Sequence, residues 1–434
     1  MNLLYSNDKI GQYPDSWYAA TTPSLAAFEP LTTDIRTDVC IVGAGYTGLS
    51  SALHLAERGY DVVVLEAQRV GFGASGRNGG QLGSGQNVGQ DKLERMMGPD
   101  DAKLLWHLGE ESKDLVKSLI AQHQIDCHLK PGIANLALTA KEMAELHLEA
   151  AHLSSHYGYD QITQLDKAQG QALCPSPTYH GGYLDRGAAH LHPLAYALGL
   201  ARAAKAAGVR IFERSEVIDI RKGAKPVITC GNGAVTCTHA IVACNGYLGQ
   251  LNRKVAARVM PINNFIAATE PLGADAAKVL TQDIAVADTK FVVNYFRLSH
   301  DGRLLFGGGE NYSYHFPVDI AAKVRGPMQK IFPHLSDVKI DYAWGGTLAI
   351  TAHRMPYLTR LDNNILSASG YSGHGVGTAT LSGKLMALAI AGQSEGFDTM
   401  ARMPSVPFPG GKWVQSPLLK LAMTWYSLRD NLGV

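Results

Sequence analysis

Residues 38–66 read DVCIVGAGYTGLSSALHLAERGYDVVVLE, and this stretch decides the fold. The apolar run at 39–42 has the character of a buried parallel strand, and so does a second run at 62–65. Apolar residues recur at helical intervals between the two runs, and Glu66 closes the second one. Three glycines in G-x-G-x-x-G spacing join the first strand to the helix: Gly43, Gly45 and Gly48. This order of elements predicts a dinucleotide-binding strand–helix–strand unit.

Each part of this unit has a physical role. Gly43 permits a tight turn, Gly45 lets the main chain approach a pyrophosphate, and Gly48 lets the helix pack closely on the strand. Glu66 can accept hydrogen bonds from ribose hydroxyls, and its charge would repel a 2′-phosphate. The motif alone does not separate NAD from FAD. The helix N-terminus offers free N–H groups to phosphates, and the predicted contacts of this turn also include Ala44, Tyr46 and Thr47.

Composition and charge narrow the class of protein. A chain of 434 residues predicts two or three domains, and 46% hydrophobic with 18% charged residues is ordinary for a mixed helix and strand protein. A net charge of +1 argues against binding to nucleic acid or to an anionic membrane. No run of 18 apolar residues predicts a transmembrane helix, and the N-terminus does not resemble a signal peptide. We therefore expect a cytoplasmic protein, and no pattern indicates its oligomeric state.

The cysteines and histidines do not predict a metal site. The six cysteines form no C-x-x-C pair and no Cys/His cluster with zinc spacing. Cys40 and Cys244 lie in apolar strand candidates, where reduced, buried thiols are common. His190 and His192 form a pair without a further ligand, so we expect a structural or capping role for them.

A second glycine-rich stretch follows the nucleotide unit directly. Residues 67–86 read AQRVGFGASGRNGGQLGSGQ, which is both polar and dense in glycine. It leaves the end of the ribose-binding strand, where the other half of a large cofactor has to lie, and its glycines allow the main chain to contact a flat ring. We expect cofactor contacts from Ala67, Gly73, Ala74, Ser75, Arg77, Asn78, Gly79, Gly80 and Gln81.

These motifs together resemble a known family. The pieces at 43–67 and 73–81 are similar to the D-amino-acid-oxidase-like family of FAD enzymes, and within it to the branch of gamma-glutamylputrescine oxidoreductases. Further similar pieces are HLHPLAYALGLARAA at 190–204, YFRLSHDGRLLFGG at 295–308, WGGTLAITAHRMPYL at 344–358 and GYSGHGVGTATLSGKLMA at 370–387. The resemblance covers nearly the whole chain and implies FAD rather than NAD.

The predicted fold is α/β, with an α+β second domain. The resemblance implies a Rossmann-like FAD-binding domain of the glutathione-reductase type, interleaved with a substrate domain. Alternating residues across 259–344 predict a mostly antiparallel sheet for the substrate domain. The predicted limits are 36–90, 176–258 and 345–395 for the FAD-binding domain, 91–175 and 259–344 for the substrate domain, 1–35 for an N-terminal arm, and 396–434 for a C-terminal extension with an amphipathic helix at 417–428.

The resemblance assigns further cofactor contacts. Val217 matches a residue with main-chain contacts near the adenine, and Cys244 with Asn245 matches the family's chain crossing beneath the flavin. A glycine-rich loop at 370–377 opens a helix whose N-terminus would stabilise negative charge on the reduced ring. The contacts predicted in this last segment are Gly370, Gly373, His374, Gly375, Val376 and Thr378.

The implied reaction is the oxidation of a small-molecule amine by hydride transfer from the carbon that bears nitrogen to flavin N5. This step needs a neutral amine, and burial against aromatic walls favours the neutral form. We expect Tyr295, Phe296, Trp344 and Tyr371 in those walls. His374 is expected either to relay a proton or to form a hydrogen bond beside the ring. Arg297 is our first candidate to bind a substrate carboxylate, with Arg303 and Arg354 as further candidates.

Two departures from the family's sarcosine oxidases affect these expectations. No cysteine lies beyond Cys244, so we expect non-covalent FAD. The position near Leu305 lacks the lysine that those oxidases use for oxygen activation, so the acceptor is either oxygen or another electron carrier. For the substrate we expect gamma-glutamylputrescine or a similar primary amine, giving an imine, then an aldehyde and ammonia. The alternatives are glycine, sarcosine, a D-amino acid or another secondary amine, and a non-catalytic FAD protein.

Overall fold

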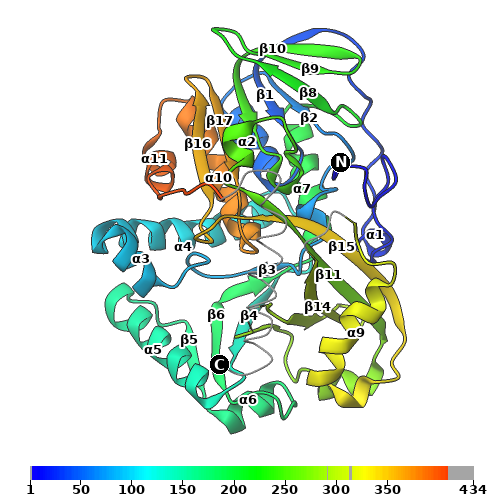
Figure 1. Ribbon diagram of the computed structural model, residues 1–434, viewed down its shortest axis with the longest axis vertical. Coiled ribbons are helices and arrows are strands. Elements are labelled where there is room, and N and C mark those ends of the chain that lie inside the picture. Colours follow the sequence, from blue (N-terminus) through cyan, green and yellow to red (C-terminus); the bar gives the residue numbers. More distant parts are fainter. Residues whose placement is uncertain (1, 291, 312–314, 409–434) are drawn as a thin grey trace.

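A computed structural model describes residues 2–290, 292–311 and 315–408. Within these residues the chain forms two sheets, one above the other in the view of Figure 1, with helices around both. The helices are α1 (Trp17–Thr21), α2 (Tyr46–Ala56), α3 (Gln90–Met97), α4 (Pro99–Gln122), α5 (Ala140–Tyr157), α6 (Lys167–Leu173), α7 (Pro193–Ala206), α8 (Arg253–Ala256), α9 (Ile320–Ile331), α10 (Gly375–Ile390) and α11 (Glu395–Ala401).

The first sheet contains the predicted nucleotide unit. Strands β2, β1, β10 and β17 run parallel, β7 extends the parallel part, and β16 adds an antiparallel edge. The hairpin β8–β9 branches from β10. The strands in spatial order are β16 (Tyr357–Asp362), β17 (Ile365–Ser369), β10 (Gly233–Val242), β1 (Ile35–Val42), β2 (Val62–Leu65) and β7 (Arg210–Phe212), with β8 (Val217–Arg221) and β9 (Val227–Cys230) beside them.

The turn between β1 and α2 depends on glycine, as the sequence predicts. Gly43 has φ +104°, which side chains rarely adopt, and a Cβ there would lie 2.7 Å from the Ala243 carbonyl oxygen. A Cβ on Gly48 would lie 1.9 Å from the Gly43 carbonyl oxygen. The helix can therefore lie against its own entry turn only without these side chains.

The second sheet is mostly antiparallel, which confirms the prediction for this part of the fold. Among the described strands, one neighbouring pair, β12 with β4, runs parallel. In spatial order the strands are β15 (Ile340–Ile350), β11 (Met260–Pro271), β14 (Arg303–Asn311), β13 (Tyr295–Leu298), β12 (Ala285–Asp288), β4 (Lys130–Leu136), β6 (Gly182–His190) and β3 (Gln81–Leu82), with β5 (Ile162–Leu165) paired to β6.

Helices bury one side of each sheet. On the first sheet α2 packs between α10 and α7, and a Cβ on Gly383 of α10 would lie 2.4 Å from the Thr47 carbonyl oxygen of α2. On the second sheet α9 packs on β11, β14 and β15, as Figure 1 shows at the lower right. Buried aromatic residues fill this second core: Phe265, Phe296, Phe306 and Phe332.

The sheets divide the chain differently from the predicted limits at three places. Strand β3 falls in the predicted FAD-binding segment 36–90 but pairs with β6 of the second sheet. Strand β6 falls in the predicted FAD-binding segment 176–258 but pairs with β3, β4 and β5 of the second sheet. Strand β15 continues the second sheet to Ile350, beyond the predicted boundary at 344. Strand propensity does not specify which sheet a strand joins, and this explains the three differences. With these changes, the domain limits remain our proposal.

The N-terminal arm, residues 2–34, is tied to the body by polar contacts. Asp8 forms an ion pair with Arg77 at 3.1 Å, and Tyr5 donates a hydrogen bond to Glu216 at 2.5 Å. The Gly11 N–H donates to the side chain of Gln68 at 2.6 Å. The arm therefore lies along the segment that follows β2.

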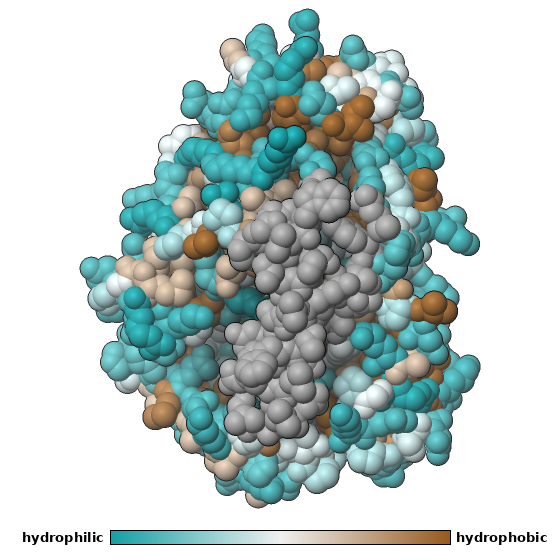
Figure 2. Space-filling model, in the orientation of Figure 1, coloured by the Kyte–Doolittle hydropathy of each residue, from teal (hydrophilic) through white to brown (hydrophobic). Residues whose placement is uncertain are grey.

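The described surface and helices add two observations. Most of the coloured surface in Figure 2 is hydrophilic, and hydrophobic side chains there form small groups. No helix in the described part of the chain is both long and apolar enough to cross a membrane. The amphipathic helix predicted at 417–428 lies outside the described residues.

Candidate functional site

One cavity of about 1410 Å³ extends between segments of both sheets. Its walls come from parts of the chain that are far apart in sequence, because the turns at the ends of β1, β2 and β10 meet there with β6, β11, β12 and β15. Many of the predicted contacts line it: Gly43, Gly45, Tyr46, Thr47, Glu66, Ala67, Gly73, Ala74, Ser75, Arg77, Asn78, Gly79, Gln81, Val217, Cys244, Asn245, Tyr295, Gly373, His374, Gly375 and Val376.

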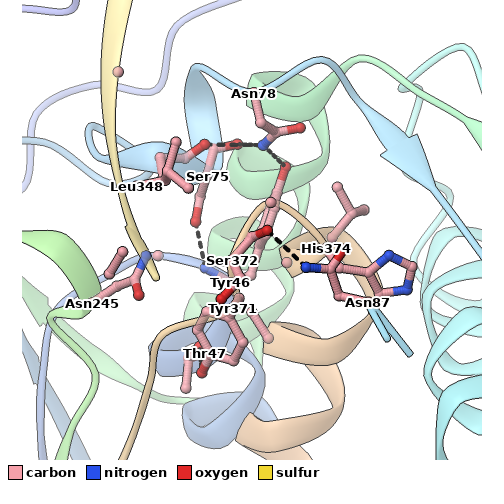
Figure 3. A pocket seen from close by; sticks show the side chains of 18 of the residues that line it. Tyr46, Thr47, Ser75, Asn78, Asn87, Asn245, Leu348, Tyr371, Ser372 and His374 are labelled. Atoms are coloured by element: carbon pink, nitrogen blue, oxygen red, sulfur yellow. Dashed lines mark hydrogen bonds between the residues drawn. The ribbon is translucent and has the colours of Figure 1, made fainter. Parts of the chain in front are cut away.

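Two helix N-termini open into this cavity. Helix α2 begins at Tyr46 after Gly45, and α10 begins at Gly375 after His374, and neither N-cap residue caps its helix with a side chain. The positive end of a helix dipole therefore faces the cavity at two places, and the first N–H of α2, that of Tyr46, is donated to Ser75. Nearby, a 2.7 Å hydrogen bond between the hydroxyls of Thr47 and Tyr371, both of which Figure 3 labels, links α2 to the loop that precedes α10.

The loop after β2 is held in shape by its own side chains. Ser75 Oγ accepts the N–H of Tyr46 at 3.0 Å, and the Asn78 amide donates to the Ala74 and Ser75 carbonyls at 3.0 and 3.1 Å. Figure 3 shows these bonds above the start of α2. The amide of Asn78 is used within the loop, so this residue shapes the cavity wall more than it offers donors to a ligand.

Glu66 connects the second strand to the glycine turn. Its carboxylate accepts the N–H of Ala44 at 2.8 Å and the N–H of Gln68 at 2.9 Å. Burial raises the pKa of Glu66 to about 7, with a further contribution from Glu213, while these backbone N–H groups lower it. The carboxylate lines the cavity together with Val217, as expected for a ribose-binding end.

The opposite part of the cavity has a wall in which Tyr295 packs against bare main chain. Gly79 lies so close to the Tyr295 ring that a Cβ would lie 2.6 Å from it. The Tyr295 hydroxyl donates to Asn264 Oδ1 at 2.6 Å, which fixes the ring against this glycine. Tyr295 and Gly79 both line the cavity, so this stretch of wall is a tyrosine ring beside main chain.

The cavity also contains buried polar atoms that lack a partner. Arg77 Nη2 and the Tyr247 hydroxyl are both buried, and neither has a hydrogen-bond partner among the described residues. Both residues line the cavity. Buried donors are normally satisfied, so these two atoms fit a bound group that carries acceptors. With the two helix N-termini, they make the donor set of the cavity suitable for FAD.

His374 lies next to Asn87 in Figure 3, and its ring is so close to Gly83 that a Cβ there would lie 2.7 Å from it. Its Nε2 lies 3.2 Å from the Gly85 carbonyl oxygen. Burial lowers the pKa of His374, the bond to Gly85 raises it, and Lys113 lowers it further. The imidazole is therefore neutral at pH 7, and an Nε2–H donated to Gly85 leaves Nδ1 as the acceptor nitrogen.

The structure corrects two of the predicted catalytic residues. The guanidinium of Arg297 donates to the carbonyls of Gly79, Leu191 and Leu298, and it does not line the cavity, so it is not placed to bind a substrate carboxylate. Trp344 lies behind the cavity wall and donates its indole N–H to the Arg77 carbonyl at 3.0 Å.

The other predicted residues differ in whether they line the cavity. Of the arginines considered as alternatives, Arg354 lines it, whereas Arg303 does not and is paired with Asp301 and Asp341. The remaining predicted cofactor contacts are not part of the cavity lining, although they belong to the turns that form it: Ala44, Gly48, Gly80, Gly370 and Thr378.

Sequence reasoning missed a large part of the lining. The segment 83–90 continues the predicted loop along the cavity, and Asn2 and Leu4 of the arm reach its ribose end. The high glycine content of 67–89 was the sequence feature that could have indicated the segment 83–90. No sequence pattern linked the substrate-side residues to each other: Trp106, Ile133, Asn135, Glu149, Leu153, Tyr183, Asp185 and Asp288.

Comparison with protein families matches residues 38–389 to DAO, the FAD dependent oxidoreductase family. The chain belongs to the DAO family. It is therefore an FAD-dependent oxidoreductase, and the cavity with its two helix N-termini is where this DAO-family chain would hold FAD.

Relatives of this DAO-family chain match along its whole length. It is 42% identical over 425 residues to "Gamma-glutamylputrescine oxidoreductase" of Escherichia coli (strain K12), with 98% of this chain and 100% of the relative covered. It is 40% identical to "Probable oxidoreductase OrdL" of Rhizobium meliloti (strain 1021), with 96% and 97% covered. Glycine oxidase from Geobacillus kaustophilus has the same fold, with a TM-score of 0.72 at 22% identity and coverage of 86% and 100%.

The raised pKa of Glu66 predicts how FAD binding depends on pH. Ribose hydroxyls donate to a carboxylate and favour its ionised form, so binding should lower this pKa and release protons. We expect FAD affinity to fall as the pH drops below about 7, the pKa in the free protein. The stability of the FAD-free protein depends on pH in the opposite direction. The contribution of the protonated Glu66 to folding stability is lost as the pH rises from 4.5 to about 7.

Fluorescence titration of the apoprotein with FAD between these pH values measures the change in affinity.

The matched variant for this prediction is Glu66→Gln, which keeps the shape of the side chain and removes its titration. We expect the pH dependence of FAD affinity to flatten in this variant. A slope that is the same in both proteins would assign the dependence to another group.

Proposed function

We propose that the chain oxidises a primary amine, gamma-glutamylputrescine or a similar molecule, to an imine that water hydrolyses to an aldehyde and ammonia. Bound FAD supplies the hydride acceptor, flavin N5, for the hydrogen on the amine-bearing carbon. The amine also gives up one proton, so the two hydrogens lost from the C–N unit leave as hydride and proton. The non-covalent attachment of FAD remains a prediction.

The observation that carries this proposal is the continuity of one cavity from the cofactor residues into the second sheet. Past His374 and Gly83 the lining passes to Ser84, Asp185 and Tyr183 without a break. A substrate that enters through this part would present one end to the ring. The whole-length likeness to a relative named gamma-glutamylputrescine oxidoreductase supports the same substrate class.

The charge of the substrate part also supports an amine. Its described lining carries the carboxyl groups of Glu149, Asp185 and Asp288, and the lining includes no described lysine. The two arginines in the whole described lining are Arg77, which is paired with Asp8, and Arg354. Carboxylates with few cations attract ammonium groups and raise their local concentration.

The reacting amine has to be neutral when it loses hydride, and the wall near His374 favours that form. Tyr295 and Tyr371 line this region, and burial raises the pKa of Tyr371 to about 12, so its hydroxyl stays protonated. A largely apolar wall penalises an ammonium beside the ring. The neutral His374 can take up the proton that the amine releases, and we propose it as the relay.

The test is anaerobic bleaching of the yellow protein with a panel of amines. We expect gamma-glutamylputrescine to reduce the flavin faster and at lower concentration than glycine, sarcosine or a D-amino acid. Preference for one of the small amino acids would overturn the proposal in favour of the alternative substrates. A flavin that no amine bleaches would indicate a non-catalytic FAD protein. Reoxidation of the reduced protein by air or by a dye then distinguishes oxygen from another acceptor.

A further inference from the structure

The substrate part of the cavity contains one carboxylate with an unusual environment, Glu149. Helix α5 turns the same face to the cavity at Leu146, Glu149 and Leu153, which are three and four residues apart. Two leucines on this face are ordinary for a helix packed on a sheet. An acid between them is costly unless it has a partner.

The other two carboxylates in this part of the cavity are already satisfied. Asp185 accepts hydrogen bonds from Ser84 Oγ at 2.6 Å and the Tyr159 hydroxyl at 2.7 Å, and from the N–H groups of Gly187 and Ala188 at 2.9 and 3.2 Å.

Asp288 accepts the side-chain and main-chain N–H of Asn294 at 2.7 and 2.9 Å, and the N–H of Lys290 at 3.2 Å. Asp185 and Asp288 therefore hold turns of the second sheet together, and their oxygens are largely used within the protein.

Glu149 accepts no hydrogen bond from any residue that the structure describes. Burial raises its pKa, Asp91 raises it further, and His152 lowers it. Its carboxylate lies close to the main chain of Gly89, where a Cβ would lie 3.5 Å from Glu149 Oε1, and both residues line the cavity. A bound cation would relieve the cost of this unpaired acid.

Two buried amides in the same lining point to a ligand independently of the acid. Gln86 and Gln90 are 9% and 3% exposed, and both line the cavity. Their amide nitrogens donate to the carbonyls of Leu105 and Ala102, at 2.8 Å in each case. Their Oε1 atoms have no partner among the described residues. Gln86 lies on the loop and Gln90 begins α3 directly after Gly89, the glycine that Glu149 approaches. Two unpartnered acceptors in this part of the lining suit a group with several N–H donors, such as an ammonium.

The strand register separates the two ends of this cavity. Gln81, a predicted ring contact, pairs with His190, which also pairs with Lys130 of β4. Tyr183, which lines the same part of the cavity as Glu149, pairs with Asn135 of β4. Five residues of β4 separate these two rows, which is about 16 Å at ~3.3 Å per residue. A ligand that spans this distance is elongated, unlike glycine or sarcosine.

We propose that Glu149 binds a second ammonium group of the substrate, the one that is not oxidised, at the far end of the cavity. This inference rests on the proposed function and assigns to Glu149 the recognition of substrates that carry a second ammonium group. In gamma-glutamylputrescine the second ammonium is on the α-carbon of the glutamyl group. Glu149 is thus a specificity-determining residue, and the amide oxygens of Gln86 and Gln90 add acceptors beside it.

The experiment compares two substrates that differ only in this ammonium: gamma-glutamylputrescine and N-glutarylputrescine, which has hydrogen in place of the α-amino group. Anaerobic stopped-flow reduction of the FAD-loaded protein gives the limiting rate and the apparent Kd for each. We expect Glu149→Gln to raise the Kd for gamma-glutamylputrescine by about 10- to 100-fold, as for loss of a charged hydrogen-bond partner. The Kd for N-glutarylputrescine and both limiting rates should change by about twofold or less.

Glu145→Gln is the matched control, because Glu145 lies one turn earlier on α5, is exposed, and pairs with Lys141 at 3.9 Å. We expect this variant to behave as the unmodified protein with both substrates. Equal effects of Glu149→Gln on the two substrates, or no effect on either, would overturn the assignment of Glu149 while leaving the proposed function intact. If neither amine bleaches the unmodified protein, the proposed function fails, and this inference fails with it.

Discussion

Gly48→Ala is expected to yield a protein that is purified without its yellow colour. The added Cβ would lie 1.9 Å from the Gly43 carbonyl oxygen and 3.3 Å from Ile41 Cγ2. The first contact is with main chain, so no side chain can rotate away, and the turn that presents N–H groups to the phosphates has to move. Overpacking of about 1–3 kcal/mol corresponds to FAD binding that is weaker by about 10- to 100-fold. The measurement is FAD bound per protein after purification and after incubation with FAD.

The matched control is Gly326→Ala in α9. A Cβ at Gly326 meets no atom within 4 Å outside its two chain neighbours, and α9 does not line the cavity. Pro327 follows directly and disfavours a side chain before it in a helix, so we expect a slightly lower thermal midpoint but full FAD content. Circular dichroism of both variants shows whether the fold is kept. A Gly48→Ala protein with normal FAD content would contradict the role assigned to this turn.

Arg77→Met is expected to cause the largest loss of stability among the substitutions considered. The guanidinium is almost fully buried and donates to Asp8, to the Phe72 carbonyl at 2.7 Å and to the Gly345 carbonyl at 3.0 Å. Methionine fills similar space but leaves a carboxylate and two carbonyls without this donor. Removal of one partner from a buried ion pair costs about 3–5 kcal/mol. Thermal and urea unfolding of the FAD-loaded protein measure the loss.

The control for this effect is an exposed pair of the same type. Arg210 binds Asp61 at 2.7 Å with side chains 39% and 50% exposed. We expect Arg210→Met to cost about 0–1 kcal/mol, because water screens such pairs. Similar losses in the two variants would show that burial does not set the strength of the Arg77 contacts. We also expect Arg77→Met to lose FAD more readily, since Nη2 faces the cavity lining without a protein partner.

Local pattern was sufficient to predict the nucleotide unit. The strand, glycine turn, helix and acid at 38–66 are in β1, α2 and β2 as expected, because each step depends on neighbours in sequence. The antiparallel character of the second sheet was also predictable from alternation around 291–306. The assignment of β6 to that sheet was not, since β6 pairs with β3, β4 and β5, which lie between 17 and more than 90 residues earlier in the chain.

The site was predicted well where it contacts the cofactor and poorly where it contacts the substrate. Glycine motifs identify the turns, whereas the surroundings of a side chain on a β-strand depend on what packs over each position. Arg297 lies two positions after Tyr295 on β13 and so on the same face of the strand, yet Tyr295 lines the cavity and Arg297 is held outside the lining by three main-chain carbonyls. Glu149 was not predicted as a site residue, yet it lines the cavity. Nothing in the sequence of an amphipathic helix distinguishes an acid that faces solvent from one that faces a cavity.

The cavity is divided between two sets of elements, and this division has a practical consequence. The turns of β1, β2 and α10 form the part suited to FAD, whereas α5, β4 and β6 form the substrate part. A mutant library restricted to inward positions of α5, β4 and β6 can therefore be screened directly by colour for retained FAD. Variants that pass this screen are starting points for biocatalysts that convert other long-chain amines.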